Sequence, residues 1–148
     1  MTSVLLDTTV ASFLLPSRER PELLAYAPQL RGHTLVLSFQ SVAELFYLAD
    51  RNGWGEKRRD ALKRFLARFL IVPADKALAA SWATVIARTE KLGKRLETAD
   101  AWIVATALRH DLPLITHDRD QLVLEDLGGR VITTLPRSKP KRRKRGAG

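Results

Sequence analysis

The sequence predicts an α/β sandwich built around a mostly parallel sheet. Short apolar runs alternate with longer helical segments along the 148 residues, an order that is typical of parallel strands joined by helices. Hydrophobic residues make up 45% of the chain, which is enough for a buried core. A chain of this length usually forms one domain. We therefore expect a domain at residues 1–136 and a basic, unstructured tail at residues 137–148.

The first half of the chain contains two predicted strands and two predicted helices. Val4–Leu6 is a short apolar run of β type, and Pro21–Leu30 reads as a helix because proline is favoured at the first helical position. His33–Ser38 follows a glycine and is the second strand. The next helix is expected to begin near Ser41, because apolar residues then recur at helical spacing. This predicted buried stripe comprises Val42, Leu45, Phe46 and Ala49.

The second half continues the alternation after a break at "NGWG", residues 52–55. Glu56–Phe69 has the pattern of a basic amphipathic helix, and Asp75–Leu92 is a helix that ends at a glycine, as many helices do. Ala99–His110 is the last predicted helix. The remaining apolar runs are predicted strands: Leu70–Pro73, Leu112–Thr116 and Arg130–Leu135.

The net charge of +9 comes mainly from the C-terminal tail. Arg137–Arg145, "RSKPKRRKR", contains seven basic residues and no acidic one, and without it 18 basic residues face 16 acidic ones. The tail either binds RNA phosphates or only aids solubility. The longest apolar stretch, Ala77–Ala87, is too short to span a membrane, and we expect a soluble, cytoplasmic protein. The absence of cysteine excludes thiolate chemistry and cysteine-bound metals.

Four acidic residues occupy positions that a parallel sheet would bring to one edge. Asp7 and Asp118 follow predicted strands, whereas Glu44 and Asp100 lie at the beginnings of predicted helices. Ligands of α/β sheets bind beyond the carboxyl ends of the strands. Clustered carboxylates are the ligands that Mg²⁺ and Mn²⁺ prefer, so we expect Asp7, Asp100 and Asp118 to bind such a cation, with Glu44 binding directly or through water.

Each of these acids also has a purely structural interpretation. Asp7 and Asp118 stand where acids often cap helices. Ser41-Val-Ala-Glu44 matches a capping box, and the helical wheel directs Glu44 away from the apolar stripe toward the surface. The helix dipole favours a carboxylate such as Asp100 in a first turn. The functional interpretation therefore depends on the four acids as a set.

Four stretches of the chain together resemble the PIN-domain nucleases, and specifically the VapC-type toxins of bacterial and archaeal toxin–antitoxin pairs. They are "LLDTTV", "LSFQSVAEL", "TADAWIVATALRHDLPLITHDRDQL" and "VITTL". The resemblance implies a three-layer α/β/α fold and a Mg²⁺- or Mn²⁺-dependent endoribonuclease that acts as a toxin. It also implies a homodimer and a VapB-type antitoxin that blocks the site.

The family pattern can be carried over residue by residue. Its acids map onto Asp7, Glu44, Asp100 and Asp118, and Asp120 is an alternative for the fourth. The accompanying hydroxyl groups map onto Thr8 or Thr9, Thr116, and Ser38 and Ser41. Candidate RNA contacts are Lys94 and Arg95 in "RTEKLGKR", which precedes Asp100, and Arg142 and Arg143 in the tail.

Two other functions compete with this hypothesis. A catalytically silent PIN-fold module would bind RNA or protein without needing a metal, but it would have no need for a complete set of repelling acids. A phosphoaspartyl enzyme would use Asp7 as its nucleophile. The haloacid-dehalogenase-like pattern then calls for a second acid two residues later, where this chain has Thr9.

Overall fold

The computed structural model describes residues 2–16 and 21–137 and contains one sheet of five parallel strands. The order across the sheet is β3-β2-β1-β4-β5, so that the first strand of the chain lies at the centre. This confirms the predicted parallel sheet, although several strands are shorter than expected. The strands are β1 Ser3–Leu6, β2 Thr34–Ser38, β3 Leu70–Val72, β4 Leu114–Ile115 and β5 Val131–Ile132.

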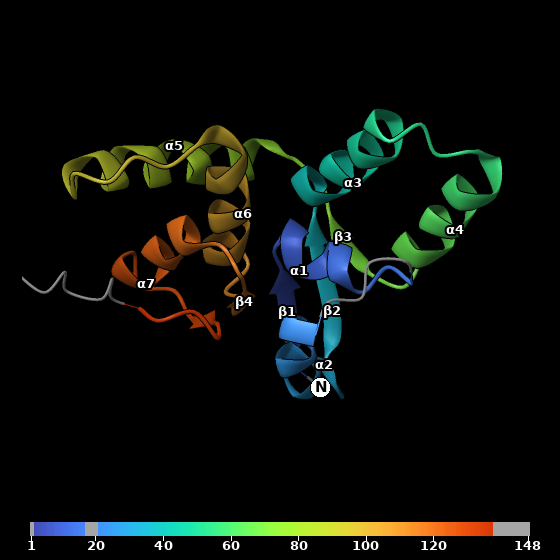
Figure 1. The fold of residues 1–148 in the computed structure, drawn as a ribbon. Coiled ribbons are helices and arrows are strands. Elements are labelled where there is room, and N and C mark those ends of the chain that lie inside the picture. The colour runs from blue at the N-terminus through green and yellow to red at the C-terminus, as the bar shows by residue number, and fades with distance from the viewer. Residues whose placement is uncertain (1, 17–20, 138–148) are drawn as a thin grey trace, which may run out of the picture.

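Helices cover both faces of the sheet, which confirms the three-layer α/β/α architecture (Figure 1). One layer contains α1 (Thr8–Phe13), α3 (Phe39–Arg51) and α4 (Glu56–Leu66). The other contains α5 (Lys76–Lys91), α6 (Thr98–Arg109) and α7 (Val123–Asp126). Among the described helices, none has both the length and the apolar composition that a bilayer crossing requires.

The alternation of side chains along the strands divides the core into two halves. Val4 and Leu6 of β1 pack with α1, α3 and α4, whereas Leu5 between them packs with α5 and α6. Leu37 and Val36 of β2 divide in the same way. All five side chains are buried, as expected for a parallel sheet that is covered on both faces.

Helix α3 differs from its prediction in both its start and its buried face. It begins at Phe39, and Ser38 caps it by accepting a hydrogen bond from the backbone N–H of Ser41 at 3.2 Å. The predicted capping box from Ser41 to Glu44 is therefore wrong. The buried residues of α3 are Ser41, Leu45 and Ala49, and Phe46 is 43% exposed although it was predicted to be buried.

Five short helical elements were absent from the prediction or differ from it. Helix α1 follows Asp7 immediately, and a 3₁₀ helix at Arg119–Leu122 leads into α7. The predicted helix Pro21–Leu30 is a 3₁₀ helix at Pro21–Tyr26 followed by α2 at Ala27–Leu30. Segments of four to six residues are too short to show a helical hydrophobic period, so their caps and packing decide their conformation.

Tyr26 connects this N-terminal segment to the far side of the sheet. Its side chain is 1% exposed, and its hydroxyl donates to the backbone carbonyl of Thr116 at 3.1 Å or to Nδ1 of His117 at 2.8 Å. The same hydroxyl accepts from the backbone N–H and the side chain of Thr134. One phenol group thus joins the end of β4 to the segment that follows β5.

We expect Tyr26→Phe to lower the free energy of unfolding by about 1–3 kcal/mol, because it leaves several buried polar groups without their partner. Urea denaturation followed by circular dichroism would measure the loss. Tyr47→Phe is the matched control, since Tyr47 is 64% exposed and should tolerate the change. Equal stability of the Tyr26→Phe variant and the wild type would contradict this role for the hydroxyl.

Candidate active site

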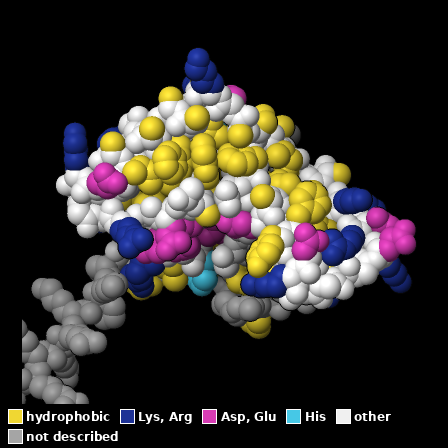
Figure 2. Space-filling model, turned by 90° about the horizontal axis from the view of Figure 1, so that it is seen from above, with side chains coloured by type: hydrophobic (Ala, Val, Ile, Leu, Met, Phe, Trp, Pro, Cys, Tyr) yellow, Lys and Arg dark blue, Asp and Glu magenta, His cyan; other side chains and the backbone are white. Residues whose placement is uncertain are grey.

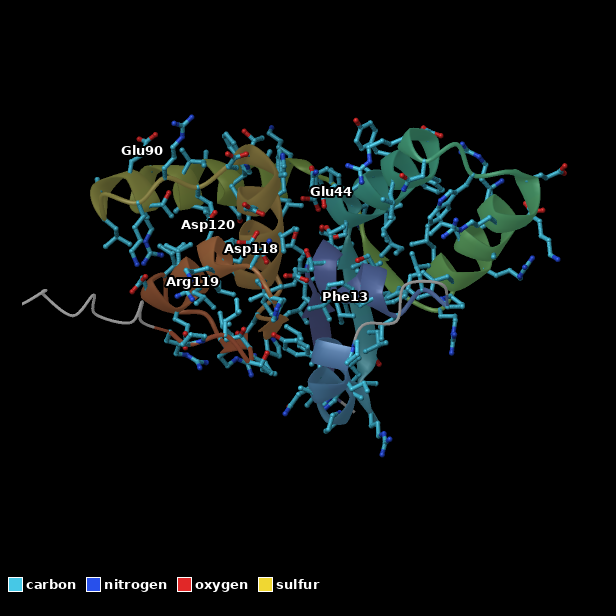
Figure 3. All side chains as sticks on the ribbon, in the orientation of Figure 1. Phe13, Glu44, Glu90, Asp118, Arg119 and Asp120 are labelled. Atoms are coloured by element: carbon cyan, nitrogen blue, oxygen red, sulfur yellow. The ribbon has the colours of Figure 1, made fainter. Side chains whose placement is uncertain are left out.

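The candidate site lies where the carboxyl ends of the central strands meet the beginnings of helices. Acidic side chains gather at this edge when the molecule is viewed from above (Figure 2). Glu44 on α3 faces the loop after β4, which carries Asp118 and Asp120 (Figure 3). The parallel topology therefore brings together acidic residues that are far apart in the sequence.

Asp7 is both a helix cap and a buried member of this cluster. It is 1% exposed, and its Oδ1 accepts a hydrogen bond from the backbone N–H of Val10 at 2.6 Å. Its Oδ2 accepts from the Thr116 hydroxyl at 2.5 Å and from the His117 N–H at 2.9 Å. The two sequence interpretations are thus compatible, because different oxygens of one carboxylate serve the cap and the cluster.

Burial raises the pKa of Asp7, and this is the largest influence on that group. The hydrogen bonds from Thr116, Val10 and His117 stabilise the ionised form and act against the rise in pKa. The negative charge of Asp118 acts with burial. Asp118 is therefore near enough to Asp7 for the two carboxylates to repel each other.

Asp100 lies in the first turn of α6, and its ionised form is also destabilised by its surroundings. Burial, its largest influence, raises the pKa of Asp100 to about 6, and the charges of Asp118, Asp120 and Glu44 contribute to the rise. A hydrogen bond from Gln121 Nε2 to Asp100 Oδ1, at 3.0 Å, acts in the opposite direction. Asp100 thus has three acidic neighbours.

Glu44 is half-buried rather than directed to the open surface as the helical wheel predicted. Gln40, one turn earlier on α3, donates to Glu44 Oε1 at 3.1 Å. The side chain does not serve as the acid of a capping box, because Ser38 caps the helix instead. The altered start of α3 leaves Glu44 facing the cluster, where its charge acts on Asp100.

Two hydroxyl groups beside the acids join the start of α1 to the first turn of α3. Thr8 Oγ1 donates to Ser41 Oγ at 2.9 Å, and Ser41 is fully buried next to Ser38. Thr9, the alternative to Thr8, is exposed. Of the two threonines that follow Asp7, Thr8 is therefore the one whose side chain contacts a buried residue beside the acids, Ser41.

Asp118 and Asp120 occupy different environments although both lie near Asp100. Asp118 is half-buried and caps the 3₁₀ helix by accepting from the Asp120 N–H at 2.9 Å. Asp120 is exposed. Only Asp118 influences both Asp7 and Asp100, so it is the more central of the two in the cluster.

Gln121 belongs to the site but was not among the predicted residues. It is 2% exposed, and it lies between Thr116 and Asp100 with a hydrogen-bonding atom toward each. In the sequence it is one polar residue in the polar run "THDRDQ", and no periodicity marks it as buried. The short 3₁₀ helix turns it inward.

The charge of the cluster fits a divalent cation. Within residues 2–16 and 21–137, no Lys, Arg or His lies at ion-pair distance from Asp7, Glu44, Asp100, Asp118 or Asp120. Repelling carboxylates without a basic partner gain stability from a bound cation. Among the described residues, no group of three or more acidic or histidine side chains is placed so that it could hold a metal ion by itself. Mg²⁺ does not need such a group, since it commonly binds one or two carboxylates together with water and substrate phosphates.

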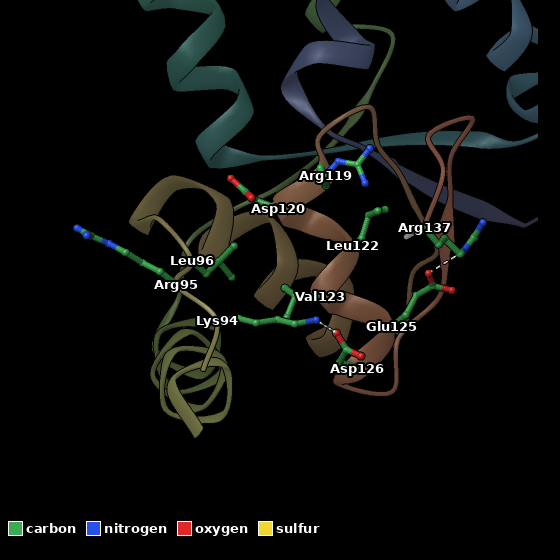
Figure 4. Close-up of a pocket in the computed structure, with 10 residues that line it drawn as sticks. All are labelled: Lys94, Arg95, Leu96, Arg119, Asp120, Leu122, Val123, Glu125, Asp126 and Arg137. Carbon is green, nitrogen blue, oxygen red and sulfur yellow. Dashed lines mark hydrogen bonds and ion pairs between the residues drawn. The ribbon is translucent and has the colours of Figure 1, made fainter. Parts of the chain in front are cut away.

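A cleft of about 600 Å³ begins beside the acids and shares Asp120 with them (Figure 4). Its basic residues differ in how freely they can bind a ligand. Lys94 is paired with Asp126 at 2.6 Å, and Arg137 is paired with Glu125 at 2.8 Å. Arg95 extends away from these pairs, and no described residue forms a hydrogen bond or ion pair with it. Arg142 and Arg143 lie outside the described residues.

Comparison with known proteins agrees with this geometry. The model of the PIN domain family matches residues 4–127. Toxin FitB of Neisseria gonorrhoeae is 29% identical over 130 residues, which cover 84% of this chain and 94% of FitB. VapC ribonuclease Y4jK of Sinorhizobium fredii is 30% identical over 121 residues, which cover 78% of this chain and 86% of Y4jK.

A solved structure gives the same result in three dimensions. The crystal structure of FitAcB from Neisseria gonorrhoeae contains a chain that superposes with a TM-score of 0.69 and 30% sequence identity. The match covers 87% of this chain and 96% of that one. With a family model that spans most of the sequence and a shared fold, this chain belongs to the PIN domain family.

Proposed function

We propose that this protein is a metal-dependent endoribonuclease that acts as the toxin of a toxin–antitoxin pair. The observation that carries the proposal is the pair of carboxylates, buried Asp7 and half-buried Asp100, that face further acids without a described basic partner. The relatives named VapC ribonuclease and toxin FitB support the choice of RNA and of a toxin. A silent binding module would keep this repulsion without using it.

Asp7, Asp100 and Asp118 would hold the cation, Mg²⁺ or Mn²⁺, and Glu44 would bind it directly or through a water. The chemistry that such a cation supplies is activation of a water nucleophile and neutralisation of charge on the phosphodiester. The protein's own contribution is orientation. The backbone N–H groups of Val10 and His117 fix both oxygens of Asp7. Thr116 supports Asp7 from the side, and Thr8 with Ser41 ties the start of α1 to the start of α3.

The cleft beside the acids is the proposed path of the RNA strand. Arg95 on one wall is available for a phosphate, whereas Lys94 already neutralises Asp126. A guanidinium binds a phosphate with two parallel hydrogen bonds, so that one free arginine can fix the register of a strand. The acids then meet the backbone at the end of the cleft that contains Asp120.

We also propose that the protein forms a homodimer and that a VapB-type antitoxin inhibits it. The support is the likeness to FitB, a protein named as a toxin, and to the solved FitAB assembly bound to a DNA fragment. The acidic cluster gives a physical basis for inhibition, since a basic side chain from a partner would neutralise the same charge that a cation does.

We expect Asp7→Asn and Asp100→Asn to reduce cleavage of RNA in Mg²⁺ or Mn²⁺ by more than the roughly 10–100-fold that loss of an outer metal-site partner costs. Both changes keep the shape of the side chain and remove its charge. Total RNA is the substrate, and mapping of the new ends measures cleavage. Asp60→Asn is the control, because Asp60 is exposed on α4, far along the chain from the acids. Equal cleavage by all four proteins would refute the assigned roles.

We expect the affinity for Mn²⁺ to fall as the pH decreases below about 6. Cation binding requires ionised carboxylates, and Asp100, with its pKa raised to about 6, takes up a proton in that range. Each carboxyl group that must lose a proton weakens the apparent affinity by about tenfold per pH unit below its pKa. Calorimetric titration at pH 7.5 and pH 5.5 measures the difference. An affinity that does not change between these pH values would contradict the role of Asp100 as a ligand.

We expect Arg95→Ala to weaken the binding of single-stranded RNA and Lys94→Ala to have little effect. Loss of one phosphate contact should make the dependence of log K on log salt shallower by about 0.7. Fluorescence anisotropy of a labelled RNA, recorded in EDTA so that no cleavage occurs, measures both quantities. If Lys94→Ala weakened RNA binding as much as Arg95→Ala does, the result would contradict the proposal that the ion pair with Asp126 keeps Lys94 from binding RNA.

A further inference from the structure

Gln121 connects two acids of the cluster, Asp7 and Asp100, through one hydrogen-bonded chain. Its Oε1 lies 2.8 Å from the Oγ1 of Thr116, and its Nε2 lies 3.0 Å from Asp100 Oδ1. The same Thr116 oxygen lies 2.5 Å from Asp7 Oδ2 and accepts from the Asp118 N–H at 3.0 Å. The chain therefore runs from Asp7 at the end of the central strand, through Thr116 and Gln121, to Asp100 on α6.

The chemistry of the contacts fixes the orientation of the amide. Asp100 Oδ1 is an acceptor, so the NH₂ end of Gln121 faces it, and the carbonyl oxygen then faces the Thr116 hydroxyl, whose single proton is shared between Gln121 Oε1 and Asp7 Oδ2. A glutamate at this position would have no donor for Asp100 and would add another negative charge. A methionine would have the same length but neither a donor nor a strong acceptor.

Burial makes these contacts specific. Gln121 and Thr116 are 2% and 0% exposed, so water cannot readily replace either partner. A buried amide group without hydrogen-bond partners is energetically unfavourable. This penalty favours the side-chain conformation in which both the NH₂ group and the carbonyl oxygen of Gln121 have a partner. Asp100 in turn receives the one described side-chain hydrogen bond that opposes the repulsion by Glu44, Asp118 and Asp120.

We propose that Gln121 is a positioning residue that holds the carboxylate of Asp100 in a fixed orientation relative to that of Asp7. This inference rests on the proposed function, because the benefit of the fixed geometry is the binding of one cation by acids from different layers of the fold. Partners that orient metal ligands in this way commonly contribute 10–100-fold to metal affinity.

The first test measures Mn²⁺ binding by calorimetry in the wild type, in Gln121→Met and in Val85→Ala. Gln121→Met should bind Mn²⁺ about 10–100-fold more weakly, because it keeps the length of the side chain and removes both hydrogen bonds. Val85 is 1% exposed on α5, so Val85→Ala destabilises the same half of the core without touching the acids. Equal Mn²⁺ affinity in folded Gln121→Met and the wild type would overturn the proposal.

A second test needs neither a metal nor a substituted Gln121. In the metal-free wild type, the side-chain NH₂ protons of Gln121 should exchange slowly with solvent in ¹⁵N-resolved NMR spectra. Asp100→Asn should shift these resonances and accelerate their exchange, whereas Asp60→Asn should leave them unchanged. Resonances that do not respond to Asp100→Asn would overturn the bridge, even if Gln121→Met failed to fold.

The two tests separate this inference from the proposed function. A wild type that binds no Mn²⁺ would refute the metal-dependent nuclease and, with it, the part of the inference that concerns cation binding. The NMR response would still decide whether Gln121 orients Asp100. A wild type that binds Mn²⁺ together with an unaffected Gln121→Met variant would refute the positioning role alone.

Discussion

The burial of a carboxylate at the end of the central strand is the constraint on which the rest of the site depends. An ionised Asp7 removed from water is strongly unfavourable unless hydrogen bonds replace its hydration. The replacements come from α1 and from the segment after β4, through Val10, His117 and Thr116. These segments can reach Asp7 only when β1 and β4 are parallel neighbours. The requirements of one side chain and the topology of the sheet therefore agree.

The same topology accumulates negative charge at one edge. Strand exits and helix starts coincide there, so Asp118, Asp120 and Glu44 repel Asp100, and Asp118 also repels Asp7. A cluster of this kind costs stability in the metal-free protein and becomes favourable when a cation is shared. Basic side chains elsewhere on the described surface pair with other acids, such as Arg59 with Asp50 and Lys94 with Asp126, and leave this edge acidic.

The neighbouring cleft has a different balance of charge. Several of its basic groups are held by acids of the cleft or, for Arg119, by the backbone carbonyl of Pro136, and Arg95 stands apart from them. Ion pairs of this exposed type contribute little to stability, but they determine which cations remain free to bind a ligand. An acidic site next to a cleft with an available arginine suits a substrate that is itself an anion and that needs a metal at its reacting phosphate.

The sequence by itself determined the α/β architecture and the positions of the acids along it. Alternating strands and helices require a largely parallel sheet, and that rule placed Asp7 and Asp118 at strand exits and Asp100 at a helix start. These are local properties, readable from apolar runs and their flanking residues. The resemblance of the motifs to PIN-domain nucleases added a role for Glu44 that the helical wheel opposed.

Only the tertiary structure decided the details that depend on contacts between distant segments. The face of α3 that is buried was predicted incorrectly at Phe46, because Thr8 and Ser38 draw Ser41 inward and rotate the helix relative to the apolar stripe. Gln121 has no sequence signal, because its value comes from lying between Thr116 and Asp100. The pairing of Lys94 with Asp126 and the isolation of Arg95 are likewise invisible in "RTEKLGKR". Periodicity reports which side of a segment is apolar, whereas hydrogen bonds between segments are fixed only when the chain is folded.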